Sequence, residues 1–278
     1  MPRRVFRKTI LAAIGALALT LGGAGKARAG DAAPIALHDG LVWADVDCGG
    51  TILHFVVDTG AGSSCINLAA AKRLGLRLGE ALNVAGVGGR TPGYRCDGFQ
   101  GSVGGMALPQ EVVALDLSGP ARACSEAIDG LIGADFFRGK VVRIDYARRM
   151  LSSGDALAEG SGTRLRIANG VMCVPVAVNG EEARWTRLDT GCTDALYWCE
   201  GADCRRKGAG KSVALAWGAG SDFREEVAVG TVRLHDVAVT VRDGEIFPGE
   251  AGLLGNGALS RYCVTIDGIR KRLVLSPL

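Results

Sequence analysis

The tripeptide Asp-Thr-Gly occurs twice in this chain, at residues 58–60 and 189–191. If both copies reach one site, they bring two carboxyl groups face to face. Two such groups can share one proton, because like charges at short distance oppose the ionisation of both. One carboxylate then serves as a general base toward water while its protonated partner serves as a general acid. Asp58 and Asp189 are therefore the candidate catalytic residues, and hydrolysis by an activated water is the chemistry they would support.

A second motif follows each tripeptide and indicates an internal repeat. The stretches that begin at Gly130-Leu131-Ile132-Gly133 and Gly252-Leu253-Leu254-Gly255 align over 22 residues, without a gap, at an offset of 122. Eight aligned positions are identical: Gly130/Gly252, Leu131/Leu253, Gly133/Gly255, Val142/Val264, Ile144/Ile266, Asp145/Asp267, Arg148/Arg270 and Leu151/Leu273. A repeated fold unit explains such a pattern, and each unit would supply one aspartate.

The residues around each aspartate suit a tight turn at the end of a buried strand. Phe55-Val56-Val57 reads as that strand for the first copy. Glycine lets the backbone fold beneath the carboxylate, where its amide can donate a hydrogen bond to it. Threonine hydroxyls could bond across the interface between the two units. The residues expected to support the dyad are Thr59, Gly60, Thr190 and Gly191.

Short apolar or alternating runs between glycine-rich turns predict a mostly β chain. The expected strands cover Leu41–Val46, Ile52–Val57, Glu111–Leu117, Val141–Ile144, Val171–Val178 and Val232–Val241. One helix is expected from Leu68 to Leu74, with Asn67 as its N-cap and Gly75 at its end. Gly160-Ser161-Gly162 interrupts the pattern, which predicts an N-terminal lobe over 30–159 and a C-terminal lobe over 160–278.

Residues 1–29 have the pattern of an export signal. They contain six basic residues, no acidic residue and a 13-residue apolar stretch, which is too short to span a bilayer. Arg3-Arg4-Val5-Phe6-Arg7-Lys8 resembles the twin-arginine pattern, with an ordinary secretory signal as the alternative. We therefore expect an exported protein, periplasmic or secreted, without a stable membrane anchor after the signal is removed.

The charge of the chain gives no support to nucleic-acid binding. The whole chain has 32 basic and 29 acidic residues, but six of the basic ones lie in the signal, which leaves 26 against 29. The three histidines, His38, His54 and His235, show no ligand spacing, so neither a metal nor another cofactor is expected.

Nine cysteines in an exported chain suggest some disulfides, with at least one cysteine left over. Cys199 with Cys204 is the most local candidate pair, and Cys96 with Cys124 is a second one. Cys192 follows the second Asp-Thr-Gly directly, but no histidine lies near it in sequence to support a thiol mechanism.

Together, the two Asp-Thr-Gly turns and their Leu-Ile-Gly and Leu-Leu-Gly partners resemble the pepsin–retropepsin superfamily of aspartic proteases, in a bilobal bacterial form. The resemblance covers nearly all of the chain after residue 29. It implies an all-β fold with two homologous, barrel-like lobes and an active site in the cleft between them. It also implies an endopeptidase that acts on peptides or unfolded proteins, as a monomer with both aspartates in one chain.

The resemblance further implies a hairpin flap over the cleft, for which the candidate is Val84–Phe99 with its tip at residues 88–93. Gly88, Gly89 and Tyr94 are the flap residues expected to contact substrate, although Tyr94 has a packing role as an equal alternative. The Cys199–Cys204 spacing also resembles a small disulfide loop of pepsin-like enzymes.

Some residues depart from the pepsin-like pattern. The third position after each aspartate is Ala61 or Cys192, where pepsin-like lobes have a hydroxyl. Arg187 stands two residues before Asp189; it either faces solvent or faces the dyad, where it would lower the carboxyl pKa values. These departures favour a competing hypothesis, a noncatalytic periplasmic peptide-binding module on the same fold.

Four other acidic residues lie near turns. Asp145 and Asp267 recur at equivalent positions at the ends of strands, and a structural hydrogen-bonding role is expected for them. Asp135 and Asp194 are expected to be solvated.

Overall fold

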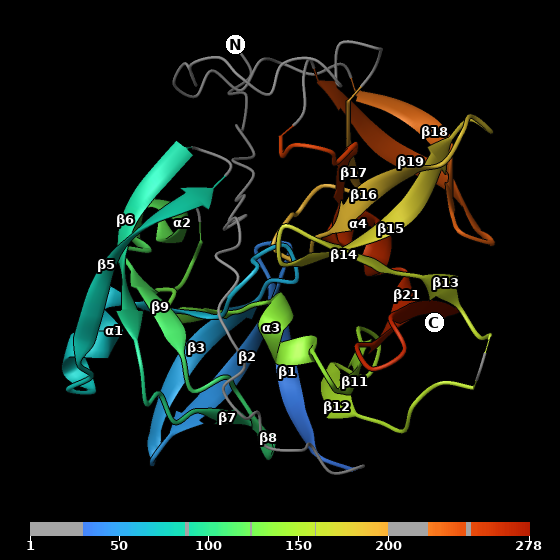
Figure 1. Ribbon diagram of the computed structural model, residues 1–278. Helices are drawn as coiled ribbons and strands as arrows, with labels where there is room; N and C mark the ends of the chain where they lie inside the picture. Colours follow the sequence, from blue (N-terminus) through green and yellow to red (C-terminus); the bar gives the residue numbers. More distant parts are fainter. Residues whose placement is uncertain (1–29, 87–88, 123, 159, 200–221, 243–245) are drawn as a thin grey trace, which may run out of the picture.

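The computed structural model describes residues 30–86, 89–122, 124–158, 160–199, 222–242 and 246–278. Within these ranges the protein is mostly β, with short helices at a few connections. Two halves lie side by side, one built by the blue-to-green part of the chain and the other mainly by the yellow-to-red part (Figure 1). The sequence-based expectation of a mostly β chain is confirmed.

The strands up to residue 153 are β1 (Ala32–His38), β2 (Leu41–Cys48), β3 (Thr51–Val57), β4 (Cys65–Asn67), β5 (Leu78–Gly86), β6 (Gly89–Cys96), β7 (Ser102–Val103), β8 (Met106–Ala107), β9 (Val112–Leu115), β10 (Gly130–Ile132), β11 (Val141–Asp145) and β12 (Met150–Ser153). The later strands are β13 (Thr163–Arg164), β14 (Arg166–Ala168), β15 (Val171–Val178), β16 (Arg184–Leu188), β17 (Leu196–Cys199), β18 (Asp222–Val229), β19 (Val232–Arg242), β20 (Gly252–Leu254), β21 (Tyr262–Asp267) and β22 (Arg272–Pro277). The helices are α1 (Leu68–Arg73), α2 (Ser118–Ala121), α3 (Ala134–Phe137) and α4 (Asn256–Leu259).

The six strands expected from the sequence are all present, with ends that differ by at most two residues. The expected helix is also present as α1. The Asn67 side chain accepts a hydrogen bond from the amide of Ala69, and the helix stops at Gly75, which has a φ of +68°. Local signals sufficed here because a cap and a positive-φ glycine act within a few residues of the chain.

Each half contains the same set of strand pairings around its Asp-Thr-Gly turn. In the first half, β3 runs parallel to β10, β10 runs antiparallel to β4, and β4 runs parallel to β9. In the second half, β16 is parallel to β20, β20 is antiparallel to β17, and β17 is parallel to β19. The ends of β3 and β16 therefore lie in equivalent surroundings.

The outer strands differ between the halves. In the second half β18 pairs with both β19 and β15, so β15, β16, β20, β17, β19 and β18 close into a six-stranded barrel. In the first half the sheet continues from β9 through β6 to β5, where the order ends. The β5–β6 hairpin forms the outer left part of Figure 1.

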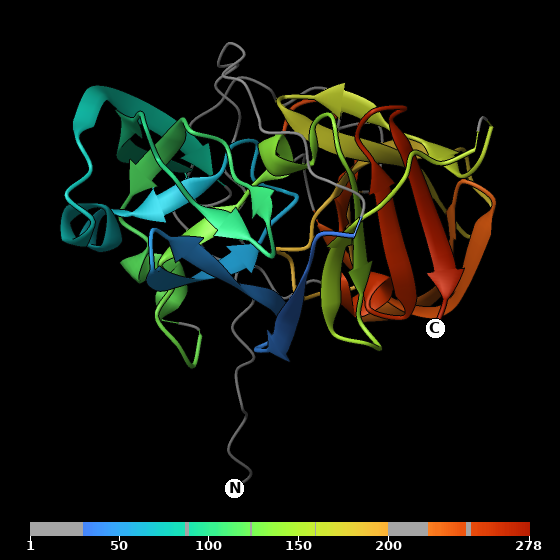
Figure 2. The ribbon, with the colours of Figure 1, turned by 90° about the horizontal axis from the view of Figure 1, so that it is seen from below.

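One sheet is shared by the two halves. Its order is β13-β22-β21-β11-β12-β1, so three strands from after residue 160 continue directly into three strands from before it. In Figure 2 the yellow-green strands lie beside the red ones at this junction. Within the β11–β21 pair, Val142 lies opposite Ile266 and Ile144 lies opposite Val264. Because Val142 corresponds to Val264 in the sequence repeat, and Ile144 to Ile266, equivalent strands pair with each other about a local two-fold axis.

The main hydrophobic core runs through both halves. One cluster of buried side chains includes Phe55, Phe136 and Ile144 from the first half together with Leu188 and Ile266 from the second. The hydrophobic effect therefore holds the two halves together as well as stabilising each of them. This continuous core holds the ends of β3 and β16 in a fixed position relative to each other.

We expect Ile144→Ala to lower the free energy of unfolding by about 2–5 kcal/mol, because it leaves a cavity in the shared core. Ile144 is fully buried at the β11–β21 junction. The neighbouring Arg143→Ala on the same strand is the control, since Arg143 is exposed. Urea denaturation of both variants measures the effect, and equal midpoints would show that the junction adds no stability.

Candidate active site

The first Asp-Thr-Gly turn holds Asp58 at the end of β3. The backbone amide of Asp58 donates to the carbonyl of Ile132 at 2.9 Å, which extends the β3–β10 pairing by one residue. The amides of Gly60 and Ala61 donate to Asp58 Oδ1 at 3.0 and 3.1 Å. Asp58 is fully buried, so the turn itself supplies the hydrogen bonds that the carboxylate has lost from water.

The second turn repeats this arrangement around Asp189 at the end of β16. The amide of Asp189 donates to the carbonyl of Leu254 at 2.9 Å, and the amide of Gly191 donates to Asp189 Oδ1 at 2.9 Å. Asp189 is 1% exposed. The two aspartates that the repeat pointed to are thus presented in the same way by the two halves.

The two turns approach each other so closely that only glycine fits between them. A Cβ atom on Gly60 would lie 2.3 Å from Asp189 Cγ, and one on Gly191 would lie 2.5 Å from Asp58 Cγ. Each glycine therefore packs directly on the carboxyl group of the other turn. The sequence suggested that these glycines allow a tight turn; the structure adds this contact across the interface as the stricter requirement.

Two threonines bind the turns together by reciprocal hydrogen bonds. The amide of each threonine donates to the hydroxyl of the other at 3.0 Å. The Thr59 hydroxyl then donates to the carbonyl of Leu188 at 2.8 Å, and the Thr190 hydroxyl donates to that of Val57 at 2.7 Å. The predicted bond between halves through threonine hydroxyls is present in both directions.

Burial raises the pKa of both aspartates. The pKa of Asp58 lies well above its usual range because of burial and the adjacent charge of Asp189. Burial also raises the pKa of Asp189, to about 6, against the opposing effect of the Arg187 charge. Asp58 Oδ2 is buried and accepts no hydrogen bond in the described part of the chain. One proton shared by the two carboxyl groups would give that atom a partner and relieve the repulsion between the charges.

The sequence of this region matches a known family. Residues 44–136 match the model of the family described as Aspartyl protease, and a search of curated proteins found no match. These residues form an aspartyl protease domain. The domain contains β3 with Asp58, the first turn and β10, and its family implies aspartic peptidase chemistry.

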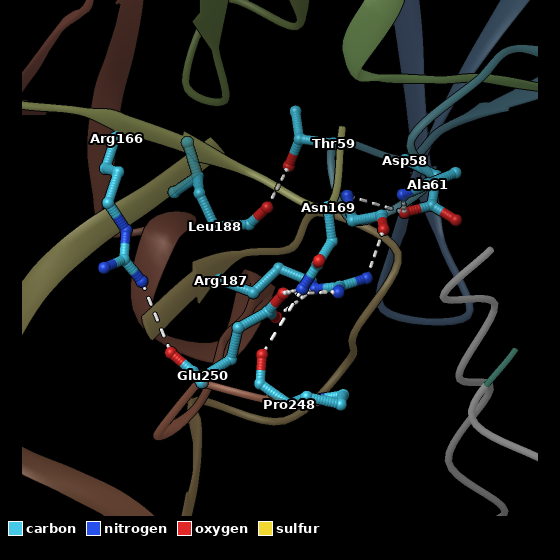
Figure 3. A network of polar contacts seen from close by, with 11 residues as sticks. Asp58, Thr59, Ala61, Arg166, Asn169, Arg187, Leu188, Pro248 and Glu250 are labelled. Carbon is cyan, nitrogen blue, oxygen red and sulfur yellow. Dashed lines mark hydrogen bonds and ion pairs between the residues drawn. The ribbon is translucent and has the colours of Figure 1, made fainter. Parts of the chain in front are cut away.

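Arg187 is buried beside the first Asp-Thr-Gly turn, residues 58–60, and does not face solvent. Its Nε and Nη2 atoms donate to the two carboxylate oxygens of Glu250 at 2.6 and 2.8 Å. Its Nη1 atom donates to the carbonyl of Gly60 at 2.9 Å, and its guanidinium lies 3.5 Å from the ring centroid of Phe247. Figure 3 shows the side chain between Glu250 and the first turn. Of the two alternatives for Arg187, the solvent-facing one is wrong, because the side chain is buried with Glu250 as its counter-charge.

Asp135 supports the turn of the protease domain from below. The Ser64 amide and hydroxyl donate to its carboxylate at 2.7–2.9 Å, and the amide of Gly133 donates to the Ser64 hydroxyl at 3.0 Å. The expectation that Asp135 is solvated is therefore wrong. Asp194, for which the same was expected, is half-buried and so only partly exposed to solvent.

Asp145 and Asp267 have the structural role that was expected of them. Asp145 accepts a hydrogen bond from the amide of Arg148, and Asp267 accepts hydrogen bonds from the amides of Ile269 and Arg270.

The contributions of Glu250 and Asn256 to the site were not predicted from the sequence. The Asn256 amide group donates to the carbonyls of Gly40 and Thr190, and its oxygen accepts from the Tyr146 hydroxyl, so it ties the second turn to the first half. A signal for Glu250 was present in the repeat. At the offset of 122 it aligns with Ile128, just as Arg187 takes the place of Val56 two residues before the aspartate. Two apolar positions replaced by opposite charges indicate an ion pair.

The predicted flap is a hairpin of β5 and β6. Gly86 pairs with Gly89, so residues 89–93, which were expected at the tip, belong to strand β6. Gly88 lies outside the described residues. Tyr94 is half-buried, lies opposite Ala114 of β9 and packs against the main core. These contacts favour its packing role, and substrate contact by Gly89 and Tyr94 stays a prediction.

The cysteines correct one expectation. Cys96 and Cys124 are both free thiols; Cys96 is buried at the end of β6, whereas the Cys124 thiol donates to the carbonyl of Pro120. The predicted Cys96–Cys124 disulfide is therefore wrong. Cys204 lies outside the described residues, so its pairing with Cys199 stays a prediction.

Among the described residues, no group of histidine, cysteine, aspartate and glutamate side chains is arranged to hold a metal ion. The described helices are all too short to cross a membrane.

We expect Thr190→Val to lower the free energy of unfolding by about 1–3 kcal/mol. The reason is that two buried groups, the Thr59 amide and the Val57 carbonyl, lose their hydrogen-bond partner. Valine keeps the shape of the side chain but removes its hydroxyl. Thr51→Val on exposed β3 surface is the matched control. Chemical denaturation measures the difference, and a loss no larger than that of the control would contradict a stabilising cross-link.

The dyad should also make stability depend on pH. A carboxyl group whose folded pKa is raised contributes full stability below its unfolded pKa and loses it as pH rises through the folded value. For Asp189 this window runs from the ordinary pKa of 3.8 to about 6. The free energy of unfolding should therefore fall more steeply over this range in the wild type than in the Asp58→Asn/Asp189→Asn variant, as urea titrations at several pH values would show. Parallel curves would contradict the raised pKa values.

Proposed function

We propose that this protein is an exported aspartic endopeptidase in which Asp58 and Asp189 activate a water molecule to hydrolyse peptide bonds. The observation that carries the proposal is the reciprocal packing of the two turns. Each carboxyl group lies against the glycine of the opposite turn, and the threonines hold that arrangement from both sides. A structural role for the two aspartates would not call for two buried carboxyl groups with raised pKa values at one interface.

The proton balance of the reaction follows from such a pair. The dyad starts with one proton, and the ionised carboxylate takes a proton from water as that water attacks the scissile carbonyl carbon. The protonated carboxyl group meanwhile hydrogen-bonds to the carbonyl oxygen and transfers its proton, which gives a tetrahedral diol. In the breakdown of the diol, the carboxyl group that took the water proton gives it to the amide nitrogen, a diol hydroxyl returns its proton to the other carboxylate, and the carbon–nitrogen bond is cleaved. The dyad is then back in its starting state with one proton. No covalent intermediate with the enzyme is required.

The substrate class follows from the family match, which points to peptides. An extended or unfolded chain suits such a site, since its main chain is free to pair with a strand edge. The β5–β6 hairpin would orient this chain and limit the access of water. Because one polypeptide carries both aspartates, the proposed enzyme acts as a monomer.

The two halves are proposed to be homologous lobes of a pepsin-like fold, divided near residue 160. Support comes from the repeat at an offset of 122 and from the equal pairing of β3-β10-β4-β9 and β16-β20-β17-β19. The family match covers 44–136 and lies within the first of these lobes. Export to the periplasm or beyond is proposed from residues 1–29, which lie outside the described ranges.

We expect Asp58→Asn and Asp189→Asn each to reduce cleavage of an unfolded protein by at least about a thousandfold, because each removes one half of the proton exchange. Asp45→Asn is the control, since Asp45 lies exposed on β2. The assay uses the protein without residues 1–29, from roughly pH 3 to pH 7, where a carboxyl pair can share one proton.

Cleavage by the wild type and the control alone supports the dyad. Cleavage retained in either aspartate variant would refute it. If folded wild type binds extended peptides but cleaves none of them, the noncatalytic binding module becomes the better description; the absence of a hydroxyl at Ala61 and Cys192 is the feature that favours that outcome.

A further inference from the structure

The residue two positions before the aspartate, on the side of the strand that faces the dyad, differs in charge between the two halves of the protein. Side chains two residues apart in a strand point to the same face, so the residue two before each aspartate lies on the same side as the carboxyl group. In β3 this residue is Val56, which belongs to an apolar cluster; in β16 it is Arg187. Leu131 lies opposite Val56 and Leu253 lies opposite Arg187, so the two positions are equivalent in the fold. A cation therefore stands on one side of the pair only.

The geometry brings the Arg187 charge close to Asp189. Nη1 donates to the carbonyl of Gly60, and Gly60 itself packs against the carboxyl group of Asp189. The guanidinium cannot turn away, because Glu250 holds two of its nitrogens and the ring of Phe247 covers its face. Both charged side chains are buried, with Arg187 0% and Glu250 2% exposed.

Glu250 acts as the counter-ion that keeps the cation in place. It also accepts a hydrogen bond from Asn169 at 3.0 Å, so its carboxylate is held from a second side. In the first half the equivalent pair, Val56 and Ile128, is apolar and lies in one cluster. Replacement of buried ion pairs by apolar residues is often neutral or stabilising, so stability alone gives little reason for an ion pair at this place.

We propose that Arg187, held by Glu250, makes the dyad asymmetric: the shared proton resides on Asp58, and Asp189 is the ionised member. This inference rests on the proposed function and extends it to the role of each aspartate. Asp189 takes the proton from water. Asp58 hydrogen-bonds to the scissile carbonyl and passes its proton to that oxygen, so each step transfers one proton and leaves the total charge unchanged. Arg187 is a positioning residue, because it acts through Asp189.

The electrostatics of the site agree with this assignment. The Arg187 charge lowers the pKa of Asp189, while Glu250 raises it by less. The pKa of Asp58 is raised by burial and by the charge of Asp189. The other titratable groups that face the pair are the thiols of Cys65 and Cys192, whose pKa values lie well above the usual thiol range, so both stay neutral. Asp194 lies beyond Cys192 and acts on that thiol.

The test is the pH dependence of kcat/KM, which reports the ionisation of the free enzyme. In Arg187→Gln/Glu250→Gln both charges are removed while hydrogen-bonding groups remain, so the acidic limb should move up by about half to one pH unit. In Glu250→Gln the cation loses its counter-charge, so the acidic limb should move down. Opposite shifts for these two variants are the expected result.

The matched control removes a surface ion pair from the same half. Arg233 and Glu226 lie 2.8 Å apart on β19 and β18 and are both exposed. Arg233→Gln/Glu226→Gln should leave the limb where it is in the wild type. Arg187→Lys keeps the positive charge but loses the bidentate contact with Glu250. It should therefore lower the free energy of unfolding while leaving the acidic limb of the pH profile nearly where it is in the wild type. An unmoved acidic limb in Arg187→Gln/Glu250→Gln would overturn the inference.

A second measurement does not depend on turnover or on folding of the Arg187 variants. In Asp58→Asn the remaining carboxyl group is Asp189, and in Asp189→Asn it is Asp58. The pH-dependent fall in unfolding free energy should end at a lower pH in Asp58→Asn, because Asp189 has the lower pKa. If the wild type is inactive but Asp58→Asn still shows the lower pH, the asymmetry of the two carboxyl groups is supported and the proposed function is refuted. Equal curves would refute the asymmetry even in an active enzyme.

Discussion

The structure depends on two buried carboxyl groups that are held against each other's turn. Glycine at residues 60 and 191 permits the approach, and the hydroxyls of Thr59 and Thr190 fix it through reciprocal hydrogen bonds. Burial raises the pKa of both carboxyl groups, and the adjacent charge of Asp189 raises that of Asp58 further. The sheet that contains β11 and β21 and the common core supply the stability that keeps the two buried carboxyl groups in place. The proposed reactivity of the pair follows from packing across this interface.

The second constraint is asymmetry within a repeated frame. Each half delivers its aspartate at the end of an equivalent strand with one glycine amide hydrogen bond, and Asp58 accepts a further one from Ala61. The ion pair of Arg187 and Glu250 stands where the first half has Val56 and Ile128. A buried cation next to one carboxyl group separates the proton affinities of the two, and general acid and general base roles require that separation.

Much of the fold was readable from local signals. The six expected strands and helix α1 were found because alternation, caps and positive-φ glycines act over a few residues. The flap tip was misplaced by a few residues, since Gly88 to Gly93 contains several glycines and only the pairing of Gly86 with Gly89 selects among them. Asp135 was misjudged as solvated because its partner, Ser64, lies 71 residues away in the chain.

The sequence by itself determined which residues could form the dyad, because a repeated Asp-Thr-Gly with a repeated Gly-apolar-apolar-Gly partner is a pattern along the chain. It also contained the two charges that break the symmetry. Only the tertiary structure decided where those charges go. Arg187 and Glu250 are 63 residues apart and each alone would face water, since an unpaired charge is too costly to bury. Their burial becomes possible when β16, which carries Arg187, pairs with β20, which begins two residues after Glu250, and this brings a cation to Asp189.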